Sequence, residues 1–206
     1  MILTPIPHHR LGVVLGRFAA QLDDPTARAA FAGIRATAPE RATGTAAERH
    51  RQQALAVARH FGVPLHPPGT RSGFNWDGSA LDGDSEAYVI LHEVAHFVLA
   101  PPERRRLIDF GLGPGPDTRE RVAAEHAAML PPIEREIDEA EASLLGILWE
   151  AALGQPALAS FLDQNWLEGL ERSAAAHFTD ILTRLRRRGF GDAAVLLEEV
   201  PKPGTL

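Results

Sequence analysis

The stretch Tyr88-Val-Ile-Leu-His-Glu-Val-Ala-His-Phe-Val-Leu99 sets two histidines into an otherwise apolar run. His92 and His96 are four residues apart, so on a helix their rings point the same way from successive turns. Two imidazoles in this arrangement can hold a divalent metal ion, and Glu93 beside them can move protons. The alternative is a buried helix with two structural histidines, but buried titratable rings need partners, and a metal is the simplest one. The stretch therefore predicts a metal-binding helix at the centre of the fold.

The composition indicates one domain without a membrane or nucleic-acid role. The 206 residues are 45% hydrophobic, enough for one sizeable core over 1–206, with an N-terminal helical extension (1–45), a metal-site core (84–185) and a loose tail (200–206). A net charge of -6 argues against general binding of nucleic acid or anionic membranes. No apolar run approaches the roughly 18 residues that span a bilayer, and the N-terminus lacks the pattern of a secretory signal. Without cysteine, a metal must be held by His, Asp or Glu, and a cytoplasmic location is expected.

Helical periodicity recurs along most of the chain, whereas strand patterns are scarce. Besides the metal helix, we expect helical segments at 10–22, 25–35, 45–61, 117–130, 133–153, 158–161 and 166–187, a short helix or turn at 103–111, and a short helix after 192. The expected helix caps are Asp24 before Pro25, and Asp82 or Asp84 before the metal helix. The proline- and glycine-rich segment 63–83 predicts a long loop with at most a small β-sheet. The fold class is therefore mainly α, a compact helical domain around the metal helix.

A metal site needs a third protein ligand beside the two histidines. The candidates belong to the predicted helix 133–153 or precede it: Glu134, Glu136, Asp138, Glu139, Glu141 and His126. Helical spacing places Glu136 and Glu139 on or beside the apolar stripe, and it does not separate the two. Upstream, the insert Phe74-Asn75-Trp76 either packs on the core or forms one wall of a substrate cleft.

Two blocks of the chain resemble the elongation factor P hydroxylase family. The run LHEVAHFVLAPPERRRLIDFG, Leu91–Gly111, is similar to the family signature, in which HExxH precedes a basic stretch and an Asp-Phe-Gly-like element. The block EIDEAEASLLGILWEAALGQP, Glu136–Pro156, is similar to the family's downstream helix, and an alignment without gaps puts the family's glutamate on Glu139. Weaker likenesses at Asp163–Leu167 and at His177 extend the resemblance over about residues 84 to 185.

This resemblance implies a metal-dependent hydroxylase that uses molecular oxygen on a modified lysine of an acidic, elongation factor P-like protein. His92, His96 and Glu139 would form a two-His, one-carboxylate face, which suits non-haem Fe(II), with Zn(II) as the alternative ion. Glu93 would act in proton transfer and not as a ligand. The same resemblance suggests that Arg104, Arg105 and Arg106 dock the acidic partner, the alternative being a solvated basic turn. It suggests that Asp109 hydrogen-bonds a ligand histidine, the alternative being a helix cap. His177, which aligns with a histidine of the family's last helix, is a candidate for lining the cleft.

Two other functions stay open. A gluzincin-like zinc metallopeptidase would use the same two histidines and a glutamate, with Glu93 as the general base. Peptidases of this kind align their substrate on an edge strand, and no strand pattern precedes the metal helix. A binding module with a structural metal would have no use for Glu93, and it would need a fourth ligand such as His126 or His177.

Overall fold

A computed structural model of the chain describes residues 6–70, 72–115, 118–168, 173–191 and 197. Across these ranges the chain forms helices and turns, and the expected mainly α fold class is confirmed. The α-helices are α1 (His8–Ala20), α2 (Pro25–Arg35), α3 (Gly44–His60), α4 (Ala87–Leu99), α5 (Arg121–Ala127), α6 (Pro132–Ala152), α7 (Ala157–Asp163) and α8 (Ala174–Arg187). Two 3-10 turns, η1 (Arg104–Arg106) and η2 (Ile108–Gly111), lie between α4 and α5.

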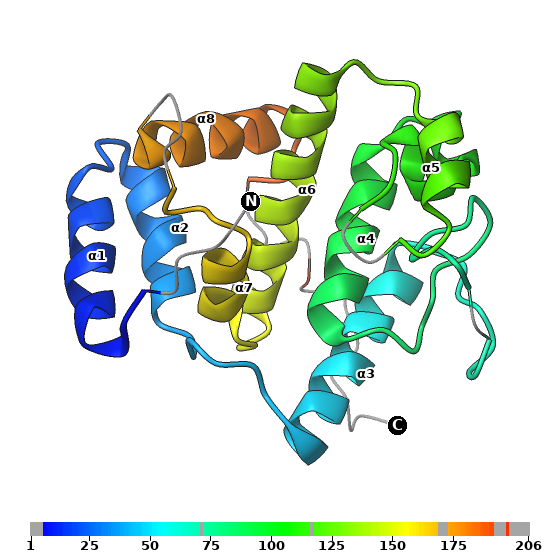
Figure 1. Ribbon diagram of the computed structural model, residues 1–206. Coiled ribbons are helices and arrows are strands. Elements are labelled where there is room, and N and C mark those ends of the chain that lie inside the picture. Colours follow the sequence, from blue (N-terminus) through cyan, green and yellow to red (C-terminus); the bar gives the residue numbers. More distant parts are fainter. Residues whose placement is uncertain (1–5, 71, 116–117, 169–172, 192–196, 198–206) are drawn as a thin grey trace.

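The long helix α6 lies in the middle of the molecule (Figure 1). Helix α4, which carries the HExxH motif, packs along one side of α6 and is itself covered by α3, while α2, α7 and α8 pack on α6 from other directions. Gly146 makes the approach of α4 possible, because a Cβ atom at this position would lie only 3.3 Å from the backbone N and Cα of His92. The acidic first half of α6 thereby lies against the metal helix.

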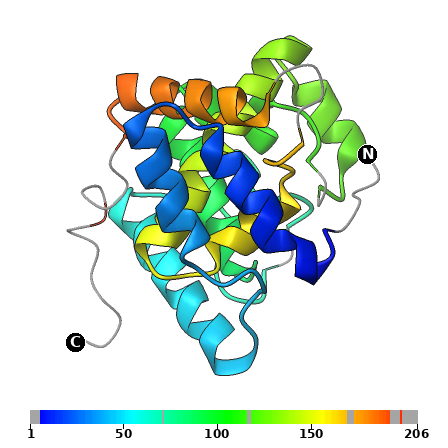
Figure 2. The same cartoon turned by 90° about the vertical axis from the view of Figure 1, so that its left-hand side faces the viewer.

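The N-terminal helices belong to the common hydrophobic core. Phe18 of α1 and Phe31 of α2 pack with Phe161 of α7 and Phe178 of α8, at ring-centroid distances of 4.7 to 6.3 Å. Figure 2 shows α1 and α2 side by side on this face, with α8 along one end of them. We call these residues the four-phenylalanine cluster. The segment 1–45, expected as an extension, thus contributes two helices to the same core as the metal helix.

The predicted helix caps are confirmed at one helix and wrong at the other. The carboxylate of Asp24 accepts a hydrogen bond from a backbone N–H in the first turn of α2, at 2.8 Å. Helix α4, by contrast, begins after Glu86 and has no side-chain cap. Asp82 accepts a hydrogen bond from the backbone N–H of Asp84 at 3.0 Å, and Asp84 accepts one from Gly69 at 2.6 Å. Both carboxylates hold the preceding loop, because short acidic side chains bond readily to nearby backbone N–H groups.

The small sheet expected within 63–83 is reduced to two isolated β-bridges, which join Leu81 to Leu65 and to Trp76. The helix expected at 166–187 begins only at Ala174, and the one expected at 117–130 is shortened to α5. The short helix start after 192, the tail 200–206 and residue 117 lie outside the described residues. In the described part of the chain, no helix has both the length and the apolar composition required to cross a membrane.

Candidate metal centre

The fold brings the three predicted metal ligands together. The Nε2 atoms of His92 and His96 are 3.1 Å apart, and each lies 3.1 Å from one carboxylate oxygen of Glu139. Two atoms that each lie roughly 2.0–2.2 Å from one metal ion are about 3 Å apart when they meet it near a right angle. Among the described residues, these three side chains form the group of His, Asp and Glu that can hold a metal ion. The two nitrogen atoms and the carboxylate oxygens are the kinds of ligand atom expected for a metal site in a chain without cysteine.

Helix packing decides between the two glutamates that spacing could not separate. Glu139 lies seven residues before Gly146, which is two helical turns, so both face α4. Glu136 is exposed and lies outside the ligand group. Glu141 pairs with Arg188 at 2.5 Å. A glycine two turns after a glutamate was therefore the sequence signal that could have selected Glu139.

The charges of the site stabilise one another. Burial opposes protonation of His96, but the carboxylates of Glu139 and Asp138 outweigh it and raise the pKa of His96 to about 10. Desolvation also opposes ionisation of Glu139, yet the imidazoles of His92 and His96 hold the pKa of this carboxyl well below its usual range. Because a ligand nitrogen must be unprotonated, binding of a metal ion would release a proton from this site.

The Asp-Phe-Gly element contacts the site in a different way from the one expected. Asp109, predicted to hydrogen-bond a ligand histidine, instead accepts a hydrogen bond from Thr118 at 2.7 Å, so this prediction is wrong. Asp109, Phe110 and Gly111 all have positive φ angles (44°, 54° and 69°), a left-handed turn that is rare for residues with side chains. This turn brings the ring of Phe110, and not the carboxylate of Asp109, onto His96, at 5.4 Å between centroids and 23° between planes. Burial and nearby carboxylates raise the pKa of Asp109 to about 6.

The three consecutive arginines do not act as one surface. Arg104 is only 7% exposed and pairs with Asp138 at 2.5 Å, so the role expected for it in docking a protein partner is wrong. Arg105 lies over the ring of Phe97, at 4.7 Å, and donates a hydrogen bond to a backbone carbonyl at the end of α4. Of the three, Arg106 is the exposed side chain.

The two remaining histidine candidates lie outside the ligand group. His126 is exposed on α5. His177 stacks on Trp166, at 5.3 Å between centroids and 16° between planes, and the indole N–H of Trp166 donates to Ser143 Oγ at 2.9 Å. His177 of α8 therefore packs on the segment that follows α7, and Trp166 in turn joins this segment to α6.

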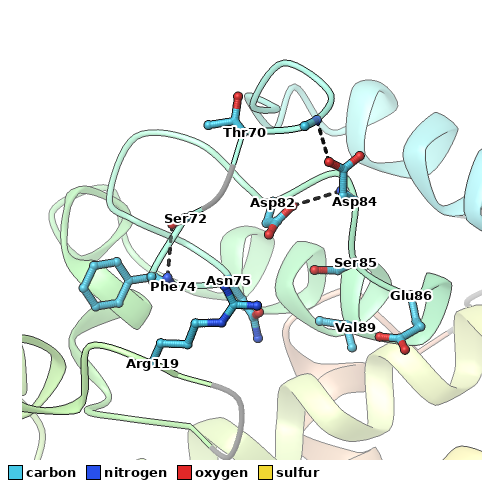
Figure 3. Close-up of a pocket in the computed structure, with 12 residues that line it drawn as sticks. Thr70, Ser72, Phe74, Asn75, Asp82, Asp84, Ser85, Glu86, Val89 and Arg119 are labelled. Atoms are coloured by element: carbon cyan, nitrogen blue, oxygen red, sulfur yellow. Dashed lines mark hydrogen bonds between the residues drawn. The ribbon is translucent and has the colours of Figure 1, made fainter.

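A cavity of about 680 Å³ opens beside the start of α4 (Figure 3). Its wall includes Phe74 and Asn75, and the side-chain amide of Asn75 donates to Glu93 Oε1 at 3.2 Å. Trp76, the third residue of the predicted insert, is buried against Phe97 and Phe110, so the insert contributes both to the core and to the cavity wall. The described lining residues carry three carboxylates and one guanidinium: Asp82, Asp84, Glu86 and Arg119.

Comparisons with protein-family models, with curated proteins and with solved structures found no match for this chain. The geometry of the metal centre, the acidic cavity and the two sequence blocks are therefore the observations from which a function can be proposed.

Proposed function

We propose that the protein is a metal-dependent hydroxylase that uses molecular oxygen, with non-haem Fe(II) as the favoured ion, to hydroxylate a modified lysine of an elongation factor P-like protein. One observation carries the proposal. The carboxylate of Glu139 meets the Nε2 atoms of both His92 and His96 on one side. A two-His, one-carboxylate set of this kind occupies one face of an Fe(II) ion, which activates oxygen at its open positions.

Glu93 is the acid–base residue of this proposal. It lies outside the ligand group, it is 8% exposed, and its Oε1 atom is held by the Asn75 amide. Oε2 is the atom that is left to hold or move a proton during turnover. A purely structural metal site would have no need for such an oriented carboxylate.

The acidic cavity supports a lysine-type substrate. Three carboxylates against one guanidinium give the described lining a net negative charge, which attracts an ammonium group. The cavity wall also holds Asn75, which contacts Glu93, so a side chain bound there would approach the acid–base residue. The expected protein partner thus presents its modified lysine to the turn before α4.

A zinc metallopeptidase is less well supported. Peptidases of the gluzincin kind bind the substrate backbone along an edge strand. In the described part of the chain, isolated bridges at Leu81 are the β-structure that precedes α4, and they offer no strand for this purpose.

The test is intact-mass analysis of lysylated elongation factor P after incubation with the protein, Fe(II), air and ascorbate, which supplies the two electrons that reduce the second oxygen atom of O2 to water. We expect a gain of one oxygen atom. Glu139→Ala should abolish the gain, whereas the matched variant Glu136→Ala, three residues away on the same helix, should retain it. An unchanged mass with iron-loaded protein would contradict the hydroxylase, and cleavage of peptides by zinc-loaded protein would establish the peptidase instead.

A further inference from the structure

Behind the metal centre, three buried side chains form a line from η1 through α6 to α4. Arg104 Nη2 lies 2.5 Å from Asp138 Oδ2, and Asp138 Oδ1 lies 3.5 Å from His96 Nδ1. The three side chains are 9%, 13% and 4% exposed, respectively. This line reaches His96 from the side opposite to Nε2, the atom that faces Glu139.

Two buried polar atoms in this line lack hydrogen-bond partners and face each other. His96 Nδ1 and Asp138 Oδ1 are both enclosed, and neither has a hydrogen-bond partner at normal distance among the described residues. Leaving such atoms unpaired is unfavourable, and a shift of roughly 0.5 Å would bring them to an ordinary hydrogen-bond distance. In that bond Nδ1–H donates to Oδ1, which fixes the tautomer that keeps the lone pair on Nε2.

The other contacts leave the histidine ring and the carboxylate little freedom to turn. Arg104 occupies Oδ2 of Asp138 through a short, charge-assisted bond, so Oδ1 is the oxygen left for the histidine. Phe110 stacks on His96 and in turn stacks on Trp76, at 5.3 Å between centroids and 7° between planes. His92 Nδ1 also lacks a hydrogen-bond partner among the described residues, so His96 is the ligand histidine whose Nδ1 faces a carboxylate.

We propose that Asp138, held by Arg104, is a positioning residue that orients His96 for metal binding. The proposal rests on the metal centre described above, and it does not depend on which reaction the metal serves. A carboxylate behind a ligand histidine typically changes metal affinity by about 10-fold to 100-fold, because it fixes the ring and makes it a better donor.

The first test is the affinity of Asp138→Asn for Co(II) and Zn(II), measured by competition with a chromogenic chelator. Asparagine has the shape of aspartate but offers one acceptor and one donor, so it cannot accept from both Arg104 and His96. We expect affinity to fall by about 10-fold to 100-fold, and the visible absorption of the Co(II) form to change because the ligand geometry changes. Affinity and spectrum equal to those of the parent protein would overturn the proposal.

A second variant separates positioning from folding. Arg104→Met combined with Asp138→Leu replaces the buried ion pair by apolar side chains, a change that proteins often tolerate without loss of stability. We expect this variant to fold, as judged by its thermal transition, but to bind Co(II) more weakly than the parent protein does. Folding with parental metal affinity would show that the pair is only structural and would overturn the proposal.

A matched control lies on the same helix. Glu141 is also buried and pairs with Arg188 at 2.5 Å, but this pair does not face a ligand histidine. Glu141→Gln should leave Co(II) affinity unchanged, whereas an equal loss in this variant would overturn a specific role for Asp138. A parent protein that binds no metal would overturn both this proposal and the proposed function, while one that binds metal without hydroxylating its substrate would overturn the function alone.

Discussion

The side-chain amide of Asn75 donates a hydrogen bond to the carboxylate of Glu93, with 3.2 Å between Nδ2 and Oε1. Asn75 belongs to the loop that lines the cavity and Glu93 to α4, so under the proposed function this bond links the substrate side of the site to its acid–base group. Asn75→Ala removes the donor. We expect kcat to fall by about 10-fold to 100-fold, because Glu93 is no longer oriented, while metal affinity stays unchanged.

The reference variant for this prediction is Glu93→Gln, which keeps the size of the side chain but cannot exchange a proton. It should lower kcat at least as much as Asn75→Ala and also preserve metal binding, as measured by metal content after dialysis. If Asn75→Ala loses metal in proportion to its loss of turnover, the amide acts on the ligands instead.

A bound metal ion should hold α4 and α6 together, because the two histidines come from one helix and Glu139 from the other. An ion that binds only to the folded state raises the free energy of unfolding by about 2.7 kcal/mol when the free ion is at 100 times its Kd. We therefore expect thermal unfolding to shift upward with Zn(II) or Co(II) and to return with a chelator. His96→Ala should show no shift, and an equal shift in this variant would place the binding site elsewhere.

Gly146→Ala tests the close approach of the two helices. Alanine normally stabilises a helix interior by about 1 kcal/mol relative to glycine. Here the new Cβ would meet the His92 backbone at 3.3 Å, so α4 must move and the ligand geometry must change. We expect no gain in the free energy of unfolding and a weaker metal affinity.

Gly16 in α1 provides the matched control, because a Cβ atom there would have no neighbour within 4 Å. Gly16→Ala should raise the free energy of unfolding by about 0.5–1 kcal/mol and leave metal binding unchanged. Equal effects of the two substitutions in denaturant titrations would contradict a special role for Gly146.

The buried carboxyl group of Glu150 should make the free energy of unfolding depend on pH. It is 2% exposed in α6, and burial raises its pKa from 4.5 to about 7 despite a contact with Arg41 at 3.5 Å. Between these two pH values the unfolded chain releases the proton while the folded protein keeps it, so stability falls as pH rises. Glu150→Gln mimics the protonated form. It should match the parent protein near pH 4 and exceed it by about 3 kcal/mol at pH 8, in urea unfolding curves at both pH values. If the free energies of unfolding of Glu150→Gln and the parent protein differ by the same amount at both pH values, the raised pKa of Glu150 is wrong.

Regular patterns made the helices and part of the metal centre predictable. The four-residue spacing of His92 and His96 and the cap at Asp24 follow from helix geometry and backbone hydrogen bonding, which are local. The choice of Glu139 required knowledge of how α6 packs on α4 at Gly146. The caps expected at Asp82 and Asp84 failed because those carboxylates have other backbone N–H groups within reach.

The surroundings of His96 could not be read from the sequence, because they depend on tertiary contacts. Asp138 reaches this histidine, and Arg104 reaches Asp138, only through the packing of α6 and η1 around α4. Three consecutive left-handed residues bring Phe110 onto His96, where Asp109 was expected, and such backbone angles are rare in residues other than glycine.

The four-phenylalanine cluster limits how far this protein can be shortened. Phe18 and Phe31, from the first two helices, cover the rings of Phe161 and Phe178 near the other end of the described chain. A fragment that starts after residue 45 would keep every metal ligand and yet expose a broad aromatic face to water. We expect such a fragment to aggregate, because the first two helices cover this aromatic face. The proposed activity should therefore be assayed in a chain that keeps both helices.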